Sequence, residues 1–183
     1  MRAILLAAGF GTRLRPITDS IPKCLVPIRG QPLLEIWLDK LICANLKPIL
    51  VNTHYRSEQV ASYVSTSVHR DDITLIHEPE LLGTAGTLMA NLSFYEDQDG
   101  LLAHSDNLCR LNLVDLLAAH KQRPPECLLT MLIFRTDNPS ACGIVELDTR
   151  GVVVGFHEKV ASPPGNLASG VPTSINKSLV VKV

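Results

Sequence analysis

The chain has 183 residues, of which 46% are hydrophobic and 19% are charged, so it is long enough to bury one core and is ordinary for a globular domain. Its formal net charge of -1 argues against a nucleic-acid partner, and no apolar run approaches the roughly 20 residues of a membrane span. The 5 cysteines are odd in number and widely spaced, which argues against a disulfide framework or a zinc site and favours reduced thiols in a cytoplasm.

Short apolar runs alternate with segments of helical periodicity along most of the chain. Strands are expected at 3–7, 48–51, 73–76, 101–103 and 128–134, and helices at 31–44, 84–92 and 111–120, with a further helix capped by Ser57. This alternation predicts an α/β fold with a mostly parallel sheet covered by helices on both faces. Later, apolar runs at 144–147 and 152–154 flank a turn that ends in Gly151, which predicts a hairpin.

The most informative stretch is residues 6–16, Leu-Ala-Ala-Gly-Phe-Gly-Thr-Arg-Leu-Arg-Pro, directly after the first strand. Ligands of such sheets bind beyond the carboxyl ends of the strands, and exposed amides there form a nest for phosphate. The dinucleotide fingerprint of an oxidoreductase fits Gly9 and Gly11 but meets Leu14 at its third glycine. A P-loop would need Gly-Lys-Ser/Thr where the chain has Gly11-Thr12-Arg13. A third interpretation is a loop that cradles a nucleoside triphosphate while Arg13 neutralises it.

Lys23 follows in the segment Pro22-Lys23-Cys24-Leu25-Val26-Pro27, where the prolines predict a rigid position. A fixed Lys suits the point charge that a phosphoryl group in transfer requires. The plain structural alternative is a glycine turn with solvated Arg and Lys side chains. The length and spacing of the whole run from 6 to 27 favour the phosphate interpretation.

The run from 6 to 16, followed by Pro22-Lys23 and Pro27, resembles the signature of the sugar-phosphate nucleotidyltransferases. This family includes mannose-1-phosphate guanylyltransferases and glucose-1-phosphate thymidylyltransferases. The resemblance extends to about Gly170 and implies a Rossmann-like fold of the nucleotide-diphospho-sugar transferase type. We expect a nucleotidyltransferase domain at 1–170, a tail outside the family pattern at 171–183, and a fold that is incomplete at its C-terminus.

The resemblance implies a reaction in which a sugar-1-phosphate oxygen attacks the α-phosphorus of a nucleoside triphosphate and pyrophosphate leaves, with Mg2+ as cofactor. Phosphoryl transfer depends chiefly on positioning and charge neutralisation. Arg13 would bind the leaving pyrophosphate and Lys23 would bridge the reacting phosphates, so these two are the expected catalytic residues. The first loop would hold the nucleotide through Leu6, Ala8, Gly9, Gly11, Thr12 and Arg13.

A second loop, Glu78-Pro79-Glu80-Leu81-Leu82-Gly83-Thr84-Ala85-Gly86-Thr87, resembles the family's second nucleotide loop. Gly83 permits close approach, and Thr84 can begin a helix whose amino end faces the ligand. The resemblance places Glu78 close to the base, where a carboxylate would accept from the N1 and N2 donors of guanine. The structural alternative is an acidic loop followed by a helix cap.

Asp106 matches the magnesium-binding Asp that the family places after a strand, although Ser105 stands where the family has Gly. Magnesium prefers oxygen ligands, often one or two carboxylates together with substrate phosphates. The alternative for a lone Asp is a cap for the following helix. We interpret His104 as a structural neighbour of this site and not as a ligand.

The sugar side is expected in the later part of the chain. The resemblance implies that Gly143 meets the sugar through its backbone, that Glu158 and Lys159 bind the sugar hydroxyls and phosphate, and that Asn166 binds the sugar. The alternative for Glu158 and Lys159 is a solvated charge pair at a strand end.

The family pattern stops after Gly170, where an aromatic-rich strand, further helices and a second magnesium-binding Asp would follow. No residue of 171–183 takes the place of that Asp, so loss of a central strand and an unpaired sheet edge are expected. The favoured function is condensation of mannose-1-phosphate with GTP by a cytoplasmic enzyme. A truncated module that binds nucleotide without catalysis is the main alternative, a dinucleotide-dependent oxidoreductase is a third, and a homo-oligomer is left open.

Overall fold

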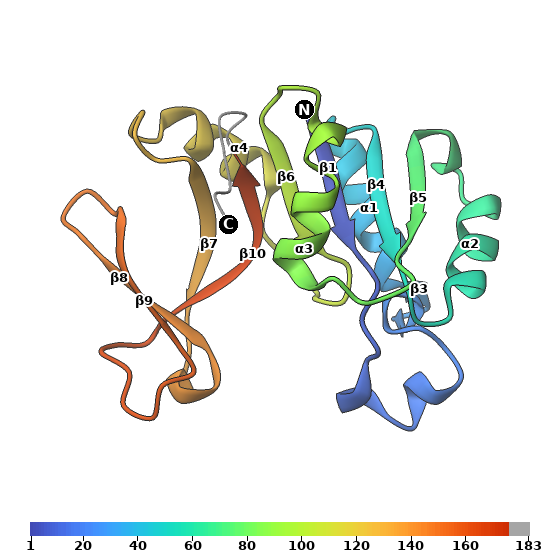
Figure 1. Cartoon of the computed structure of the whole chain (residues 1–183), viewed down its shortest axis with the longest axis horizontal. Coiled ribbons are helices and arrows are strands. Elements are labelled where there is room, and N and C mark those ends of the chain that lie inside the picture. The colour runs from blue at the N-terminus through green and yellow to red at the C-terminus, as the bar shows by residue number, and fades with distance from the viewer. Residues whose placement is uncertain (176–183) are drawn as a thin grey trace.

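The apolar runs of the sequence become the strands of an eight-stranded sheet in the computed structural model, which describes residues 1–175 (Figure 1). Its parallel part has the order β5-β4-β1-β6. These strands are β1 (Arg2–Leu6), β4 (Ile49–Thr53), β5 (Ile73–His77) and β6 (Gly100–His104). Because they run in one direction, their carboxyl ends share one edge of the sheet.

The remainder of the sheet is antiparallel. The long strand β10 (Leu167–Ile175) pairs with β6, with β7 (Leu129–Arg135) and with β8 (Gly143–Leu147). The expected hairpin joins β8 to β9 (Val153–Glu158) through the turn that contains Gly151. A short hairpin of β2 (Pro27–Ile28) and β3 (Gln31–Pro32) lies apart from the main sheet.

In the part of the chain that the structure describes, four α-helices cover the two faces of the sheet. They are α1 (Leu33–Cys43), α2 (Ser57–Thr66), α3 (Gly83–Ala90) and α4 (Leu113–Gln122). Short 3-10 turns fill the connections at η1 (Thr12–Leu14), η2 (Ile17–Asp19), η3 (Lys23–Leu25), η4 (Arg70–Asp72), η5 (Leu92–Tyr95) and η6 (Pro139–Ala141).

Alternation along β1 divides the core into two layers. Ala3 and Leu5 belong to the cluster that the apolar faces of α1, α2 and α4 complete, and Trp37 of α1 is its largest buried side chain. Ile4 and Leu6 belong to a second cluster that α3 and η5 cover. Figure 1 shows α3 in front of the sheet and α1 behind it. A strand that is buried on both faces is the structure expected of a continuous apolar run.

Several element boundaries differ by one to a few residues from the sequence expectation, and two of the differences have a local reason. Residues Gln31 and Pro32 pair as β3 with β2, so α1 begins at Leu33 and not at 31. Ser57 is the first residue of α2, and Arg56 takes the N-cap position with a positive φ.

The expectation of a lost central strand was wrong for the part of the chain that the structure describes. Strand β10 crosses the expected boundary between 170 and 171 and continues to Ile175. Its register with β6 places Thr173 opposite Leu102, so β6 has a partner on each side. Residues 176–183 of the expected tail lie outside the described residues.

Among residues 1–175, no helix combines the length and the apolar character that a membrane crossing requires.

The buried histidine of α4 predicts acid sensitivity. His120 is 2% exposed, its Nδ1 lies 2.9 Å from Thr130 Oγ1, and Arg123 and Asp99 flank it. Burial, with a smaller contribution from Arg123, lowers the pKa of His120 below its ordinary value of 6.5. The unfolded chain therefore binds more protons below pH 6.5, and the free energy of unfolding falls as the pH drops below that value.

Urea unfolding at about pH 7.5 and about pH 5.5 measures this loss of stability. We expect His120→Gln to reduce the difference between the two pH values. His77→Gln, at an exposed position of β5, is the control and should leave the difference unchanged. An equal difference in wild type and His120→Gln would contradict the assignment.

Candidate functional site

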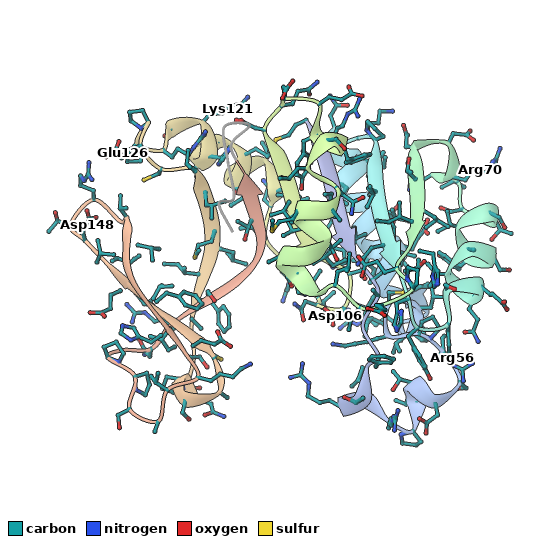
Figure 2. The ribbon with its side chains drawn as sticks, viewed as in Figure 1. Arg56, Arg70, Asp106, Lys121, Glu126 and Asp148 are labelled. Carbon is teal, nitrogen blue, oxygen red and sulfur yellow. The ribbon has the colours of Figure 1, made fainter. Side chains whose placement is uncertain are left out.

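A pocket of about 300 Å³ lies at the carboxyl ends of β1, β4 and β6. Figure 2 labels Asp106 at this edge of the sheet, below α3, whereas Asp148 marks the tip of the β8-β9 hairpin on the far side of β7 and β10. Main chain and small side chains of the first loop form one wall, and the start of α3 forms another. The lining residues are Leu6, Ala7, Ala8, Gly9, Arg13, Lys23, Cys24, Asn52, Leu81, Gly83, Thr84, Thr87, His104 and Asp106.

An ion pair spans the floor of the pocket. Lys23 Nζ donates to Asp106 Oδ2 over 2.7 Å, with the two side chains 17% and 29% exposed. Lys23 is held at the start of η3, directly after Pro22 in an extended conformation. The pair joins the end of the first loop to the segment that follows β6.

Three contacts fix the position of Asp106. The preceding residue, Ser105, is fully buried, and both its backbone NH and its hydroxyl donate to the carbonyl of Leu6 at 2.9 and 2.8 Å. Trp37 Nε1 donates to the carbonyl of Asn107 at 2.7 Å. Ser105, which departs from the glycine of the family pattern, thus ties the end of β6 to the end of β1.

The second carboxylate oxygen of Asp106 lacks a hydrogen-bond partner among the described residues. This atom, Oδ1, is buried, and the nearest ring nitrogen of His104, Nδ1, lies 3.8 Å away. The other ring nitrogen, Nε2, lies 3.4 Å from Thr84 Oγ1. Burial lowers the pKa of His104, and Lys23 lowers it further against the opposing effect of Asp106.

A buried polar network lies beneath the pocket and joins its two loops. Asn52 Oδ1 accepts from the backbone NH of Ala7 at 2.7 Å, and Asn52 Nδ2 donates to Glu78 Oε1 at 2.9 Å. Thr87 Oγ1 donates to the same Glu78 oxygen at 2.5 Å, and the backbone NH of Leu82 donates to Glu78 Oε2 at 3.3 Å. The network thereby fixes the first loop, the end of β4 and the start of α3 relative to one another.

Gly11 supports the pocket from behind without lining it. Its φ is +67°, and a Cβ there would lie 2.8 Å from Thr18 Cγ2 and 3.1 Å from Lys23 Cβ. A side chain at this position would therefore strain the backbone and press on Lys23. Thr12 begins η1 and also lies outside the lining.

Arg13 lines the pocket from η1, so the pocket contains both residues that the sequence predicted as catalytic. Cys24 also lines it but is 1% exposed, and burial raises the pKa of its thiol to about 12. A thiol with that pKa is inert at neutral pH.

Most predicted nucleotide residues and the predicted metal ligand converge on the pocket. Those in the lining are Leu6, Ala8, Gly9, Arg13, Lys23, Gly83, Thr84 and Asp106. Gly11, Thr12 and Glu78 are not. Glu78 is 3% exposed, and its carboxylate is engaged by the network described above. Contact between Glu78 and a base stays a prediction, and a base would have to reach a buried carboxylate that already accepts three hydrogen bonds.

The predicted sugar residues form a separate group on the antiparallel part of the sheet. A Cβ on Gly143 would lie 2.8 Å from Glu158 Oε2, so the two residues are close neighbours. Lys159 Nζ lies 3.0 Å from Glu158 Oε1, both side chains being more than half exposed, and Asn166 Oδ1 accepts from Arg135 at 3.1 Å. None of Gly143, Glu158, Lys159 or Asn166 lines the pocket.

Sequence reasoning missed several residues of the pocket and its support. Asn52 was not singled out, and Thr87 was given only as the last residue of the second loop, yet both are buried polar side chains. Asn52 interrupts an apolar run at the carboxyl end of its strand, and that position is the signal that could have found it. Ala7, Cys24 and Leu81 line the pocket through their place in the loops.

The pocket lies at the carboxyl edge of parallel strands and is lined by backbone loops, basic side chains and the amino end of a helix. This arrangement is typical of an α/β protein with a nucleotide-type binding site. A family model described as "Nucleotidyl transferase" matches residues 2–172. The chain therefore belongs to this family, and its sheet, with a parallel half and helices on both faces, has the α/β fold of sugar nucleotidyltransferases that the sequence predicted.

Curated relatives and solved structures agree with this membership. The chain is 33% identical over 162 residues to a mannose-1-phosphate guanylyltransferase catalytic subunit beta of Drosophila pseudoobscura pseudoobscura, covering 86% of this chain and 43% of that protein. It is 29% identical over 167 residues to the UTP–glucose-1-phosphate uridylyltransferase AglF of Haloferax volcanii, covering 91% of this chain and 68% of that one. The crystal structure of an apo UDP-glucose pyrophosphorylase superposes with a TM-score of 0.83 at 17% identity, covering 97% of this chain and 77% of the other. The chain thus spans less than half of the length of the Drosophila protein.

Removing the Asn52 side chain tests the network beneath the pocket. In Asn52→Ala the backbone NH of Ala7 loses its acceptor and Glu78 loses one donor, so we expect a loss of about 1–3 kcal/mol in the free energy of unfolding. We also expect weaker binding of nucleoside triphosphates, measured by calorimetry, because the first loop is released. Asn138→Ala, an exposed site, is the matched control and should change neither quantity. Unchanged stability and binding in Asn52→Ala would contradict the role given to the network.

Proposed function

We propose that the protein is a sugar-1-phosphate nucleotidyltransferase. It would join a sugar-1-phosphate to a nucleoside triphosphate and release pyrophosphate. The observation that carries the proposal is the convergence of Arg13, Lys23 and Asp106 on one pocket beside the start of α3. The positive charges of Arg13 and Lys23 and the amino end of α3 suit a polyphosphate. The carboxylate of Asp106 suits the divalent cation that accompanies a polyphosphate.

The pocket would hold the triphosphate through the backbone of the first loop and the amino end of α3. Arg13 offers a planar fork for the leaving pyrophosphate, and Lys23 offers a point charge to the phosphates that react. The sugar-1-phosphate oxygen would form a bond to the α-phosphorus as the bond to pyrophosphate breaks. Charge neutralisation and alignment are the contributions of the protein in such a transfer.

Asp106 fits the role of magnesium ligand. Its Oδ1 is a buried acceptor without a hydrogen-bond partner among residues 1–175, and carboxylate oxygens are the ligands that Mg2+ prefers. When bound, the cation would supply positive charge to the transferring phosphates. In the ligand-free protein, Lys23 supplies the charge that opposes Asp106.

GTP and mannose-1-phosphate are the proposed substrates. The Drosophila relative is named for this pair, whereas the Haloferax relative of similar identity is named for UTP and glucose-1-phosphate. Support for guanine from this chain rests on Glu78, whose buried carboxylate already accepts three internal hydrogen bonds. We propose a cytoplasmic location, as metabolite chemistry of this kind and reduced cysteines would require.

A nucleotide-binding protein without turnover is the second candidate. The observation that favours it is the separation of the predicted sugar residues from the pocket, because Glu158 and Lys159 pair with each other at the surface. Both candidates predict nucleotide binding, and only the first predicts pyrophosphate release.

Pyrophosphate release distinguishes the two candidates. Mannose-1-phosphate and glucose-1-phosphate are crossed with GTP, UTP, dTTP, ATP and CTP in the presence of magnesium. We expect release for one dominant sugar and base, and a decrease in rate of about 100-fold or more in Lys23→Met, because one preorganised charge is lost. Lys121→Met, at an exposed position of α4 far from the pocket, is the control and should retain the full rate (Figure 2). Folded protein that binds a nucleotide but releases no pyrophosphate would establish the second candidate.

A further inference from the structure

The polar atoms around Asp106 contain one unexplained feature. Oδ2 has the Lys23 ammonium at 2.7 Å, whereas the buried Oδ1 has no hydrogen-bond partner among residues 1–175. A buried acceptor without a hydrogen-bond partner is costly to keep, so its retention calls for a function. The nitrogen that faces it is Nδ1 of His104, at 3.8 Å.

This separation is too long for a hydrogen bond and fits two ligands of one ion. Nitrogen and oxygen ligands lie about 2.0–2.2 Å from divalent cations. Two ligands of one ion therefore lie about 3–4 Å apart, depending on the angle between them. Asp106 Oδ1 and His104 Nδ1 need only a small displacement to share a cation.

The other side of the imidazole is arranged for the same role. His104 Nε2 lies 3.4 Å from Thr84 Oγ1 at the start of α3. In the tautomer with its proton on Nε2, the ring donates to this hydroxyl and presents the lone pair of Nδ1 toward Asp106. Metal-bound histidines in proteins are commonly oriented by such a partner on the second ring nitrogen.

In place of the purely structural role expected for His104 from the sequence, we propose that it is a second protein ligand of the cation that Asp106 holds, and that the site therefore binds Mn2+ or Co2+ more tightly than Mg2+. The inference rests on the proposed function only in placing a divalent cation at Asp106. Its chemical basis is ligand type, because Mg2+ favours oxygen ligands while imidazole suits first-row transition metals. Substrate phosphates would complete the coordination.

The test uses Mn2+ and the full chain with a nucleoside triphosphate present. Bound Mn2+ is titrated by electron paramagnetic resonance, Mg2+ affinity is obtained by competition, and spin-echo modulation reports any nitrogen bound directly to Mn2+. We expect a nitrogen signal in the wild type. In His104→Asn we expect that signal to vanish and Mn2+ affinity to fall by about tenfold or more, while Mg2+ affinity changes much less. Asp106→Asn should lower the affinity for both Mn2+ and Mg2+.

His69→Asn is the matched control. Glu35, Asp39 and His69 place their ligand atoms within 4.8 Å of one another, so this group is another place where Mn2+ could meet an imidazole. His69 Nε2 already lies 2.8 Å from Asp39 Oδ1, which gives it a structural partner. We expect His69→Asn to keep the nitrogen signal and the Mn2+ affinity of the wild type.

Each other outcome overturns the inference. Bound Mn2+ without a nitrogen signal in the wild type, with binding still dependent on Asp106, would leave the cation site intact and exclude His104. A signal that vanishes in His69→Asn and persists in His104→Asn would move the imidazole ligand to the other cluster. No binding of either cation to folded, nucleotide-bound protein would remove both the inference and the magnesium site of the proposed function.

Discussion

The ion pair between Lys23 and Asp106 is the constraint on which the rest of the site depends. It connects the first loop to the end of β6, and both groups are mostly buried. Removing either partner would leave the other charge without compensation, which is far more costly than the pair itself is stabilising. Several otherwise separate features serve this contact. Gly11 makes room beside Lys23, Ser105 binds the end of β1, and Trp37 of α1 anchors the residue after Asp106.

The buried network around Glu78 provides the second constraint. It holds the two loops at a fixed separation through Asn52 and Thr87, and the amides that face the pocket gain their orientation from it. Such a network is costly when partly satisfied and specifies one arrangement when complete. A base that required Glu78 as a partner would compete with these internal hydrogen bonds. The proposed contact of Glu78 with a base would therefore couple base binding to loop rigidity through one carboxylate.

Sequence patterns predicted the parallel half of the fold well, because strands such as β1 are buried on both faces and read as continuous apolar runs. The loop around Arg13 and the position of Lys23 were also predictable, since glycines and prolines restrict the backbone locally. Asn52 was not, because its role arises from contacts with Ala7 and Glu78 that lie far away in sequence. The continuation of β10 past Gly170 was missed for a similar reason. Pairing with β6 and β7 makes this segment a strand, whereas the apolar periodicity within the segment does not predict one.

We propose that the pocket at the carboxyl ends of β1, β4 and β6 binds the phosphates of a nucleotide between the two loops. Hydrogen–deuterium exchange of the full chain, with and without a nucleoside triphosphate and a divalent cation, tests it most directly. The account predicts slower exchange of backbone amides at 7–13 and 82–87, which flank the pocket, and little change in the β8-β9 hairpin. Protection confined to that hairpin, or no protection under conditions where calorimetry shows binding, would contradict it.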